Sequence, residues 1–508
     1  MNQAFCNTCS QLVPATREER EGQVFLVKHC RKCGSTETLI SSDATRYSRK
    51  RLLDSNRQSG SCRMNCLTCN HGKTPNLVFI DVTNRCNLNC PICINNTPSM
   101  GFTFDPPIEY FERIFDYLAS LNPKPSIQLF GGEPTVRHDL IRLVHIARRR
   151  RLPTRVVTNG VKLADEAYCR ELVGQRATIM LAYDGSNPET YRTLRASERS
   201  LQAKQKALEN LSRINGAKVT LMTLVARNFN ERELPELFNL CHHYRNTVRA
   251  IYLMPLAHTW DPENFNPNVG RITLEDVESI MGDTFPSDAI EFLPAGFLGQ
   301  IGNLLRILKI KPLPFGSAHP NCESMYLMVS NGQQYLPISR YLKSSMVDIA
   351  KDLDLLDQRF SGRPRSISSF ISVFFGLLGL ARRHMDIRQC LKGKSGLAKS
   401  LHLLGILSGL LIGRRLSKLM IRHSYIQDAL QVIVLPFEDR ENLETERMER
   451  CPTAFAYFDP VQEHVRFVPS CAWSIYKTDV MRGIMEYYRE HPVPTPAAVE
   501  EMAAANVS

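Results

Sequence analysis

The stretch IDVTNRCNLNCPICINN, residues 80–96, begins as an apolar run and continues into a loop that contains three cysteines. These are Cys86, Cys90 and Cys93, in the spacing C-x-x-x-C-x-x-C. Three thiolates on one loop can bind three irons of a 4Fe-4S cluster and leave the fourth iron open for an outside ligand. A structural zinc site is the alternative for the same thiolates. The loop therefore predicts a metal site directly after a strand.

Short apolar runs alternate with helical patterns on either side of this loop. The runs are 77–83, 126–130, 154–158, 177–183, 218–226 and 248–254, and the helical stretches lie near 107–120, 137–150, 164–173, 196–213 and 231–244. Strands that alternate with helices predict βαβ units on a parallel sheet. Six strands fit either an open barrel or a doubly wound sheet, and the spacing alone does not choose between them.

Three further motifs follow the second, third and fourth of these runs. They are Gly131-Gly132-Glu133, Thr158-Asn159-Gly160, and Ala182-Tyr183-Asp184-Gly185 with Arg195 beyond it. Together with the cysteine loop they resemble the radical SAM superfamily, in which these positions surround S-adenosylmethionine (SAM). The resemblance implies an α/β fold with a partial (β/α)6 radical SAM barrel, here over residues 76–290. A small N-terminal metal-ribbon domain precedes the barrel and a mixed C-terminal region follows it.

The same resemblance implies the chemistry. Cys86, Cys90 and Cys93 hold the cluster, whose open iron chelates SAM; reductive cleavage gives a 5′-deoxyadenosyl radical that abstracts hydrogen from unactivated C–H bonds. An electron donor such as ferredoxin or flavodoxin is implied as a partner, and no catalytic side chain is identified. Arg195 either pairs with the SAM carboxylate or is an exposed arginine at a helix start. Ala182 stands where the family has a serine, so a ribose contact is not expected there. The cofactor-binding candidates are Gly131, Gly132, Glu133, Thr158, Asp184 and Arg195.

A second set of cysteines repeats the first. Cys62, Cys66 and Cys69 have the same spacing and lie 24 residues upstream, in the polar, basic segment 41–75. We assign the SAM site to the later triad, because it follows the first strand and precedes the glycine-glycine-glutamate motif. The earlier triad is then predicted to bind an auxiliary 4Fe-4S cluster or another metal, and the alternative is that one or more of its thiols only packs. Its fourth ligand would come from the C-terminal region, 291–508, although a buried free thiol is the alternative for each cysteine there. These cysteines are Cys322, Cys390, Cys451 and Cys471.

Residues 1–40 contain a third set, Cys6, Cys9, Cys30 and Cys33, as two C-x-x-C pairs separated by 20 residues. So short a unit buries too little apolar surface to fold alone, so a bound metal is expected. Four thiolates suit a zinc ribbon and a rubredoxin-like iron site equally, so the metal is iron or zinc. No basic-then-apolar leader precedes the unit, so we expect a reducing, cytoplasmic compartment rather than a disulfide scaffold.

Composition limits the remaining choices. Of the 508 residues, 43% are hydrophobic and 22% are charged, which excludes a disordered or fibrous chain and suggests several domains. The formal net charge of +12 indicates an anionic partner: nucleic acid, a membrane surface or a nucleotide-bearing ligand. Two apolar segments, 367–381 and 401–413, are each followed by two arginines and are shorter than the roughly 20 residues that span a bilayer. They suit a membrane interface, a lipid channel or a buried pair of core helices.

The order of the cysteine sets resembles the tetraether lipid synthase and membrane-spanning lipid synthase subgroup, over residues 1 to about 260. That resemblance implies a lipid substrate whose acyl or alkyl chains are joined by a C–C bond. Peripheral contact with the inner membrane face is a hypothesis. The alternative is a radical SAM enzyme with a non-lipid substrate, in pterin methylation or peptide modification. A nucleic-acid-binding ribbon protein is the non-enzyme alternative; the position of the glycine-glycine-glutamate motif argues against it, so no nucleic acid partner is expected.

Overall fold

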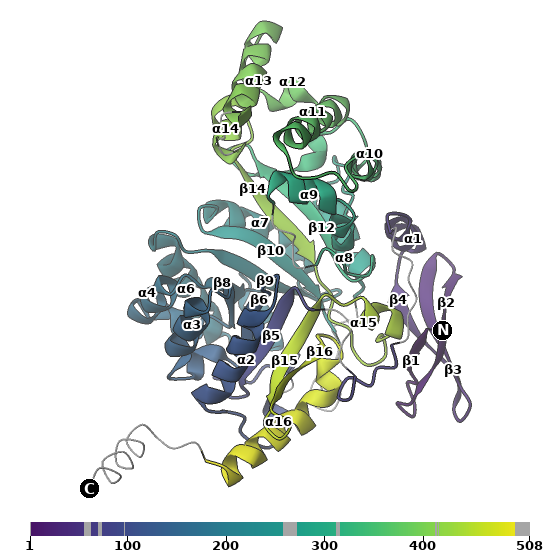
Figure 1. Cartoon of the computed structure of the whole chain (residues 1–508), viewed down its shortest axis with the longest axis vertical. Helices are drawn as coiled ribbons and strands as arrows, with labels where there is room; N and C mark the ends of the chain where they lie inside the picture. The colour runs from purple at the N-terminus through teal and green to yellow at the C-terminus, as the bar shows by residue number, and fades with distance from the viewer. Residues whose placement is uncertain are drawn as a thin grey trace.

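The structure is a computed structural model that describes residues 2–54, 62–69, 74–95, 97–257, 272–310, 315–411, 414 and 416–492. Within these residues the strands form one four-stranded and one twelve-stranded sheet. Figure 1 shows the small sheet beside the large one, with a group of helices at one end of the long axis of the molecule.

The small sheet is an N-terminal ribbon. Its antiparallel strands lie in the order β1 (Gln3–Phe5), β2 (Leu12–Arg20), β3 (Gln23–Cys30) and β4 (Gly34–Ser41), and α1 (Ala44–Leu52) follows. Leu26 of β3 and Tyr47 of α1 belong to a compact apolar core of seven buried residues. A core of this size contributes little stability by itself, which agrees with the expected need for a metal.

All six apolar runs are strands of the large sheet, as the sequence predicted. They are β5 (Leu77–Thr83), β6 (Ser126–Gly131), β7 (Thr154–Thr158), β8 (Thr178–Ala182), β9 (Val219–Val225) and β10 (Val248–Pro255). Each strand pairs in parallel with the next one along the chain. A doubly wound sheet reverses its strand order at a switch point, and this order does not reverse. The strands therefore form the open, partial (β/α)6 barrel.

Helices connect these strands. They are α2 (Ile108–Ser120), α3 (Leu140–Arg149), α4 (Glu166–Gly174), α5 (Pro188–Arg195), α6 (Arg199–Arg213), α7 (Leu234–His243) and α8 (Leu274–Thr284). On α2 the fully buried residues Tyr110, Ile114 and Leu118 recur every fourth position, so they share the face that packs on the sheet. The short helix α5 is additional to the stretches that the sequence indicated.

The C-terminal region extends both edges of the barrel. At one edge β15 (Thr453–Asp459) pairs in parallel with β5 and in antiparallel fashion with β16 (His464–Pro469). At the other edge β14 (Asp428–Val434) pairs in parallel with β10. Beyond them lie β11 (Leu293–Pro294), β12 (Ser324–Ser330), β13 (Tyr335–Pro337), α15 (Thr445–Glu449) and α16 (Trp473–Glu490). Segments far apart in the sequence thus complete one sheet.

A helical lobe, residues 346–423, lies between β13 and β14 and projects at one end of the molecule (Figure 1). It contains α10 (Met346–Gln358), α11 (Ile367–His384), α12 (Ile387–Cys390), α13 (Gly396–Leu411) and α14 (Leu416–His423), and α9 (Gly302–Leu308) packs against it. The two apolar segments form α11 and α13. In the described part of the chain, no helix is both long and apolar enough to cross a membrane. Arg415, after the second segment, lies outside the described residues.

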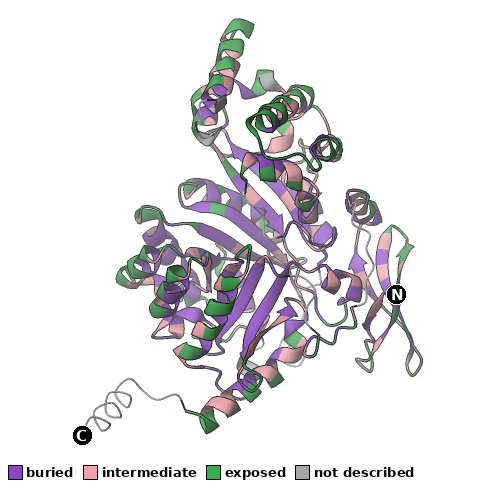
Figure 2. Cartoon of the chain, viewed as in Figure 1, coloured by how far each residue is buried: buried purple, intermediate pink, exposed green. Residues whose placement is uncertain are grey.

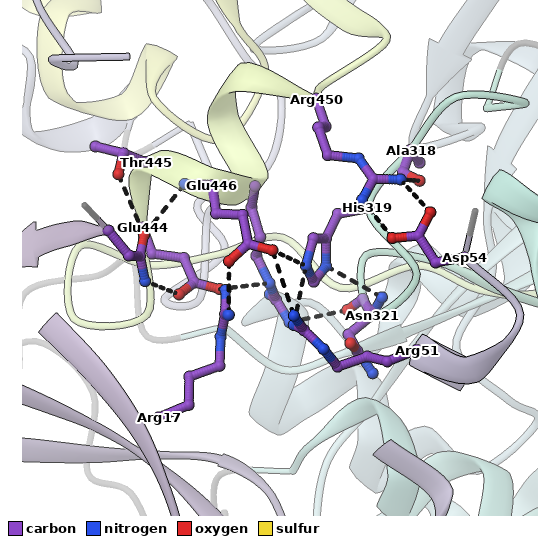
Figure 3. Close-up of polar contacts among 12 residues, drawn as sticks. Arg17, Arg51, Asp54, Ala318, His319, Asn321, Glu444, Thr445, Glu446 and Arg450 are labelled. Atoms are coloured by element: carbon purple, nitrogen blue, oxygen red, sulfur yellow. Dashed lines mark hydrogen bonds and ion pairs between the residues drawn. The ribbon is translucent and has the colours of Figure 1, made fainter. Parts of the chain in front are cut away.

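Ion pairs join the ribbon to the C-terminal region (Figure 3). Arg17 of β2 donates to Glu444 at 2.7 Å and to Glu446 at 2.6 Å. Arg450 forms a second connection, 2.6 Å from Asp54, which follows α1. These contacts link residues almost the whole chain apart and fix the ribbon against the segment that leads to Cys451.

Candidate metal and cofactor site

The loop after β5 places Cys86, Cys90 and Cys93 on the wall of one cavity, together with residues from the carboxyl ends of the barrel strands. Parallel barrels carry their sites at this end, because the loops that follow the strands meet there. Burial raises the pKa of the Cys86 thiol to about 12, and the nearby Glu133 and cysteine charges add to the increase. Burial also raises the pKa of Cys90, against the opposing charge of Arg195. Without a bound cation these thiols keep their protons.

Gly131 and Gly132 let the end of β6 lie directly against this loop. The Gly132 N–H donates to the Thr83 carbonyl at 2.7 Å, and the Glu133 N–H donates to the Arg85 carbonyl at 2.8 Å. A Cβ on Gly131 would lie 2.2 Å from the Thr83 oxygen, and one on Gly132 would lie 2.3 Å from the Arg85 oxygen. Neither position has room for a side chain, so the glycines fix the cysteine loop as well as line the cavity.

The buried carboxylate of Glu133 connects the ends of the second and third strands. It accepts hydrogen bonds from the Thr158 hydroxyl at 2.7 Å and from the Asn159 N–H at 2.6 Å. The Thr158 hydroxyl in turn accepts the Gly160 N–H at 3.0 Å. Glu133, Thr158 and Asn159 all line the same cavity as the cysteine loop. The structure therefore brings these two predicted cofactor contacts, Glu133 and Thr158, into one hydrogen-bonded unit.

Arg195 and Asp184, the other two candidates, form a buried pair. Arg195 lines the cavity, and its side chain is only 17% exposed, so it is not the surface arginine of the alternative reading. Asp184 is fully buried and is not among the described cavity-lining residues. Burial alone would raise the pKa of Asp184, but Arg195 keeps it below its ordinary value. Asp184 thus orients Arg195 at the cavity, and it also accepts the N–H of Leu224, another cavity residue, at 3.1 Å.

Lys204 is a cavity residue that the sequence did not single out. Its ammonium group donates to the Ala182 carbonyl at 2.7 Å, and burial, helped by the neighbouring charge of Arg195, lowers its pKa to about 8. Lys206 stands two positions later on α6 and is about half exposed. The helical spacing could have distinguished them, because Lys204 shares the buried face of α6 with Leu201 and Leu208, at i, i+3 and i+7, and Lys206 does not.

The rest of the cavity wall is largely apolar. It includes Phe79, Phe130, Val157, Met180, Met222, Leu224, Met254, Leu435 and Phe437. Gln128, Thr158 and Tyr252 are buried polar residues among the strand positions that line this cavity. These three methionines, three phenylalanines and three branched side chains make a surface that adapts to apolar ligands.

The donor set fits a 4Fe-4S cluster with an open iron. Three thiols from one loop lie on the same cavity as the glycine-glycine-glutamate backbone and the Arg195 guanidinium, which suit the amino and carboxylate groups of SAM. Among the described residues, the ribbon cysteines are the only group of three or more Cys, His, Asp or Glu side chains whose ligand atoms all lie within 4.8 Å of one another. The thiols of the Cys86 loop are therefore spaced more widely than the ligands of one ion. Wider spacing is appropriate for thiolates that each bind a different iron.

The ribbon cysteines, in contrast, are arranged for a single ion. The sulfur atoms of Cys9 and Cys30 lie 3.7 Å apart, close to the ~3.8 Å expected for two thiolates bound to one tetrahedral zinc. Backbone N–H groups of Cys9 and Thr8 lower the pKa of Cys6 to about 6, which favours the thiolate before metal binds. Cys33 completes the group of four.

The second triad has one late cysteine within electrostatic reach. Burial raises the pKa of Cys66 to about 12, and the charges of Cys69, Cys62 and then Cys451 add to this increase. Cys451 is the late cysteine whose charge acts on this triad. It is therefore the candidate for a fourth ligand.

Cys322 and Cys471 converge on the same neighbourhood. Burial raises the pKa of Cys471, and the charges of Cys451 and Cys322 raise it further. A small pocket beside Cys471 is lined by Asn95, which also lines the main cavity. Cys390 lies elsewhere, on α12, in an apolar cluster that includes Tyr341. Its surroundings support the buried-thiol alternative.

Comparison with known proteins identifies two domains. Residues 80–241 match the family model described as the radical SAM superfamily, and residues 2–42 match that of the HMPTM N-terminal zinc ribbon domain. Over 488 residues, the chain is 27% identical to 7,8-dihydro-6-hydroxymethylpterin dimethyltransferase from Methanocaldococcus jannaschii, which covers 93% of this chain and 92% of that protein. It is 30% identical over 201 residues to GTP 3′,8-cyclase from Petrotoga mobilis, which covers 37% of this chain and 59% of that protein.

Among solved structures, SuiB from Streptococcus suis bound to the precursor peptide SuiA is 14% identical, with a TM-score of 0.32; the match covers 56% of this chain and 70% of that chain. The cysteine loop, the glycine-glycine-glutamate contact and the sequential parallel strands agree with the family match. The chain therefore contains a radical SAM domain, preceded by an N-terminal zinc ribbon domain.

Proposed function

We propose that this radical SAM enzyme abstracts hydrogen from the apolar chain of a lipid and joins two such chains by a C–C bond. The observation that carries the proposal is the cavity beside Cys86, Cys90 and Cys93. Its wall beyond the glycine-glycine-glutamate motif consists mainly of methionine, leucine and aromatic side chains. An unactivated methyl or methylene group presents no polar atom for recognition, so shape and apolar contact must position it.

The residues of this chain would divide the work as follows. Cys86, Cys90 and Cys93 would hold the cluster, and Arg195, oriented by Asp184, would bind the carboxylate of SAM. When bound, the reduced cluster and SAM supply a 5′-deoxyadenosyl radical. The apolar wall would exclude water and keep the substrate carbon against that radical, which prevents side reactions.

A second pair of observations supports a two-stage reaction. Cys62, Cys66 and Cys69, with Cys451 in electrostatic reach, offer four thiolates for an auxiliary cluster. The pocket beside Cys471 shares Asn95 with the main cavity, so Cys471 adjoins the place where substrate would lie. Joining two chains requires two hydrogen abstractions. An auxiliary cluster next to the cavity could hold the chain activated by the first abstraction until the second has occurred.

Methylation of a pterin is the second candidate. The Methanocaldococcus jannaschii relative, which aligns over most of both chains, carries that name. A pterin has several ring donors and acceptors that need buried partners. Gln128 is the buried strand residue that could offer an amide to them from the cavity wall.

The test is deuterium transfer in the anaerobic, reduced holoenzyme. Perdeuterated phospholipid in detergent is expected to place deuterium in 5′-deoxyadenosine and to yield a coupled product by mass spectrometry. The same assay with a 6-hydroxymethylpterin would give methylated pterin if the second candidate is correct. Gln128→Leu provides a further distinction, because it should preserve lipid turnover and abolish pterin turnover. Methylation of the pterin together with no deuterium transfer from the phospholipid would overturn the lipid proposal.

A further inference from the structure

Helix α11 has two apolar faces, and only one of them is used in packing. Val373 is fully buried, and Leu377 and Leu380 pack on the same core, so these positions form the inner face. Ile367, Phe370, Ile371 and Phe375 follow the i, i+3, i+4, i+8 spacing of a second face and are 40–81% exposed. A helix that needed only to pack into the lobe would carry polar residues at these positions.

Helix α13 repeats this arrangement. Its inner face packs on α14, where a Cβ on Gly409 would lie 2.3 Å from Leu419. Its outer positions Leu397, Leu401 and Leu404 have the i, i+4, i+7 spacing of one face and are 60–76% exposed. Figure 2 shows both helices at one end of the molecule as a mixture of exposed and intermediate residues. The buried pair of core helices that the sequence allowed is therefore only half correct, because each helix buries one side.

The sequence segment that contains these two stripes is strongly basic, although α10, which packs on α11, carries four aspartates. Residues 359–427 contain thirteen Lys or Arg and a single acidic residue, Asp386. That excess of twelve equals the formal net charge of the whole chain, +12, so the remainder of the protein is balanced. Among the described residues, Arg365, Arg382 and Arg388 are exposed and have no carboxylate within ion-pair distance.

We infer that the outer faces of α11 and α13 form a docking surface for an anionic phospholipid bilayer. Apolar side chains such as Phe375 and Leu401 would enter the boundary between headgroups and acyl chains, and the arginines would contact anionic headgroups. The positive charge favours a lipid surface over a protein partner. A bilayer presents many anionic headgroups around an apolar phase, so it can bind such a surface without a specific complementary shape. Helices of 16 and 18 residues with outward apolar stripes lie in such an interface.

The strand that leaves this lobe leads toward the candidate active site. β14 begins directly after the lobe, and Leu435 and Phe437, which follow its last residue, line the cavity of the cysteine loop. Docking of the lobe on a bilayer would thus place the lipid at the start of β14, the strand that leads to this cavity. The inference rests on the proposed function, because it takes the lipid substrate from it. Its test is separate, because vesicle binding is measured without SAM and without turnover.

Vesicle flotation of the full-length, anaerobically purified holoenzyme tests the surface. We expect binding to vesicles of mixed phosphatidylcholine and phosphatidylglycerol, weaker binding at high salt, and little binding to phosphatidylcholine alone. The triple variants Phe370→Ser/Ile371→Ser/Phe375→Ser and Leu397→Ser/Leu401→Ser/Leu404→Ser should each weaken partitioning by tenfold or more, about one decade for each 1.4 kcal/mol of lost apolar burial. Leu52→Ser/Val461→Ser, two apolar residues exposed elsewhere, should bind like the wild type.

Charge reversal has its own matched control. Arg365→Glu/Arg382→Glu/Arg388→Glu should abolish binding to anionic vesicles. Arg170→Glu/Lys206→Glu/Arg213→Glu, on α4 and α6, changes the net charge equally and should preserve it. All substitutions lie at exposed positions, so unchanged thermal unfolding confirms that the variants fold.

Three outcomes would overturn the inference. They are a wild type that stays with the soluble fraction at low salt, apolar variants that bind like the wild type, and equal loss in both charge-reversal variants. A change from dimer to monomer in the apolar variants by light scattering, without vesicle binding by the wild type, would assign the stripes to self-association instead. Turnover of detergent-dispersed lipid by the apolar variants would retain the proposed function whichever way the vesicle result falls.

Discussion

Arg195 binds the Asp184 carboxylate through two parallel hydrogen bonds, with Nε 2.8 Å and Nη2 2.7 Å from its two oxygens. This geometry fixes the guanidinium at the cavity beside Cys90. Arg195→Lys keeps the positive charge but loses the planar guanidinium that makes two parallel hydrogen bonds. We therefore expect the affinity for SAM to fall about tenfold, measured by calorimetry on the anaerobic holoenzyme. Arg192→Lys, exposed on the same helix, is the control and should bind SAM normally. Equal affinity in both variants would remove Arg195 from the SAM site.

Gly132→Ala should displace the cysteine loop, because the new Cβ would lie 2.3 Å from the Arg85 carbonyl oxygen, a backbone atom that cannot move alone. We expect loss of about four irons per chain and of 5′-deoxyadenosine formation, measured by iron analysis and chromatography. Gly282→Ala, in α8, meets nothing within 4 Å and should retain full iron and activity. Retention of iron by the Gly132 variant would show that the loop does not depend on this contact.

His319 predicts a dependence of stability on pH. Burial lowers its pKa to about 3; the hydrogen bond to Glu446 opposes this shift, and the charges of Arg447 and Arg17 act with burial. Its Nδ1 accepts the Asn321 N–H at 3.3 Å, so the neutral form is built into the network of Figure 3.

Below about pH 6.5 the unfolded chain therefore binds a proton that the folded chain does not, and stability falls as the pH falls toward 3. Between pH 7 and pH 5 this amounts to about 2 kcal/mol in the free energy of unfolding. Urea titrations should find a smaller loss in His319→Gln than in the wild type. Parallel pH profiles would mean that His319 is not the group responsible.

Cys30→Ser should remove one metal ion from the ribbon and leave the other metal sites occupied. The sulfur atoms of Cys9 and Cys30 are 3.7 Å apart, so losing one ligand opens a tetrahedral site. Elemental analysis of the variant and the wild type identifies the missing element as zinc or iron. SAM cleavage should persist, because the ribbon lies on a separate sheet from the cysteine loop. A parallel loss of four irons would contradict this separation.

Cys451→Ala and Cys390→Ala distinguish a ligand from a packed thiol. Cys451 acts electrostatically on Cys66 and Cys471, whereas Cys390 lies in an apolar cluster. We expect the first variant to lose auxiliary iron while still cleaving SAM, and the second to keep all its iron. Mössbauer or EPR spectra of the reduced proteins report which cluster is affected. Normal auxiliary signals in Cys451→Ala would exclude this cysteine as the fourth ligand.

The barrel could be predicted from the sequence because the patterns that specify its strands and motifs are short and local. Each of the six apolar runs is a strand, and each motif directly follows the strand that positions it, so neighbouring residues carry both the element and the site. The ribbon was predictable for the same reason, since two C-x-x-C pairs on adjacent turns need no distant contact to be recognised. The spacing of Cys86, Cys90 and Cys93 determined the kind of metal chemistry in the same local way.

Only the tertiary structure decided the contacts between distant segments. The pairing of β15 with β5 and the electrostatic effect of Cys451 on Cys66 both depend on chain closure over long separations. The same is true of the apolar stripes on α11 and α13. Their sequence is apolar on all sides, and the inner face is defined only by what the lobe packs against it. Local periodicity specifies helices and strands. Whether a given side chain is buried, exposed or in contact with a distant residue is decided only when the whole molecule packs.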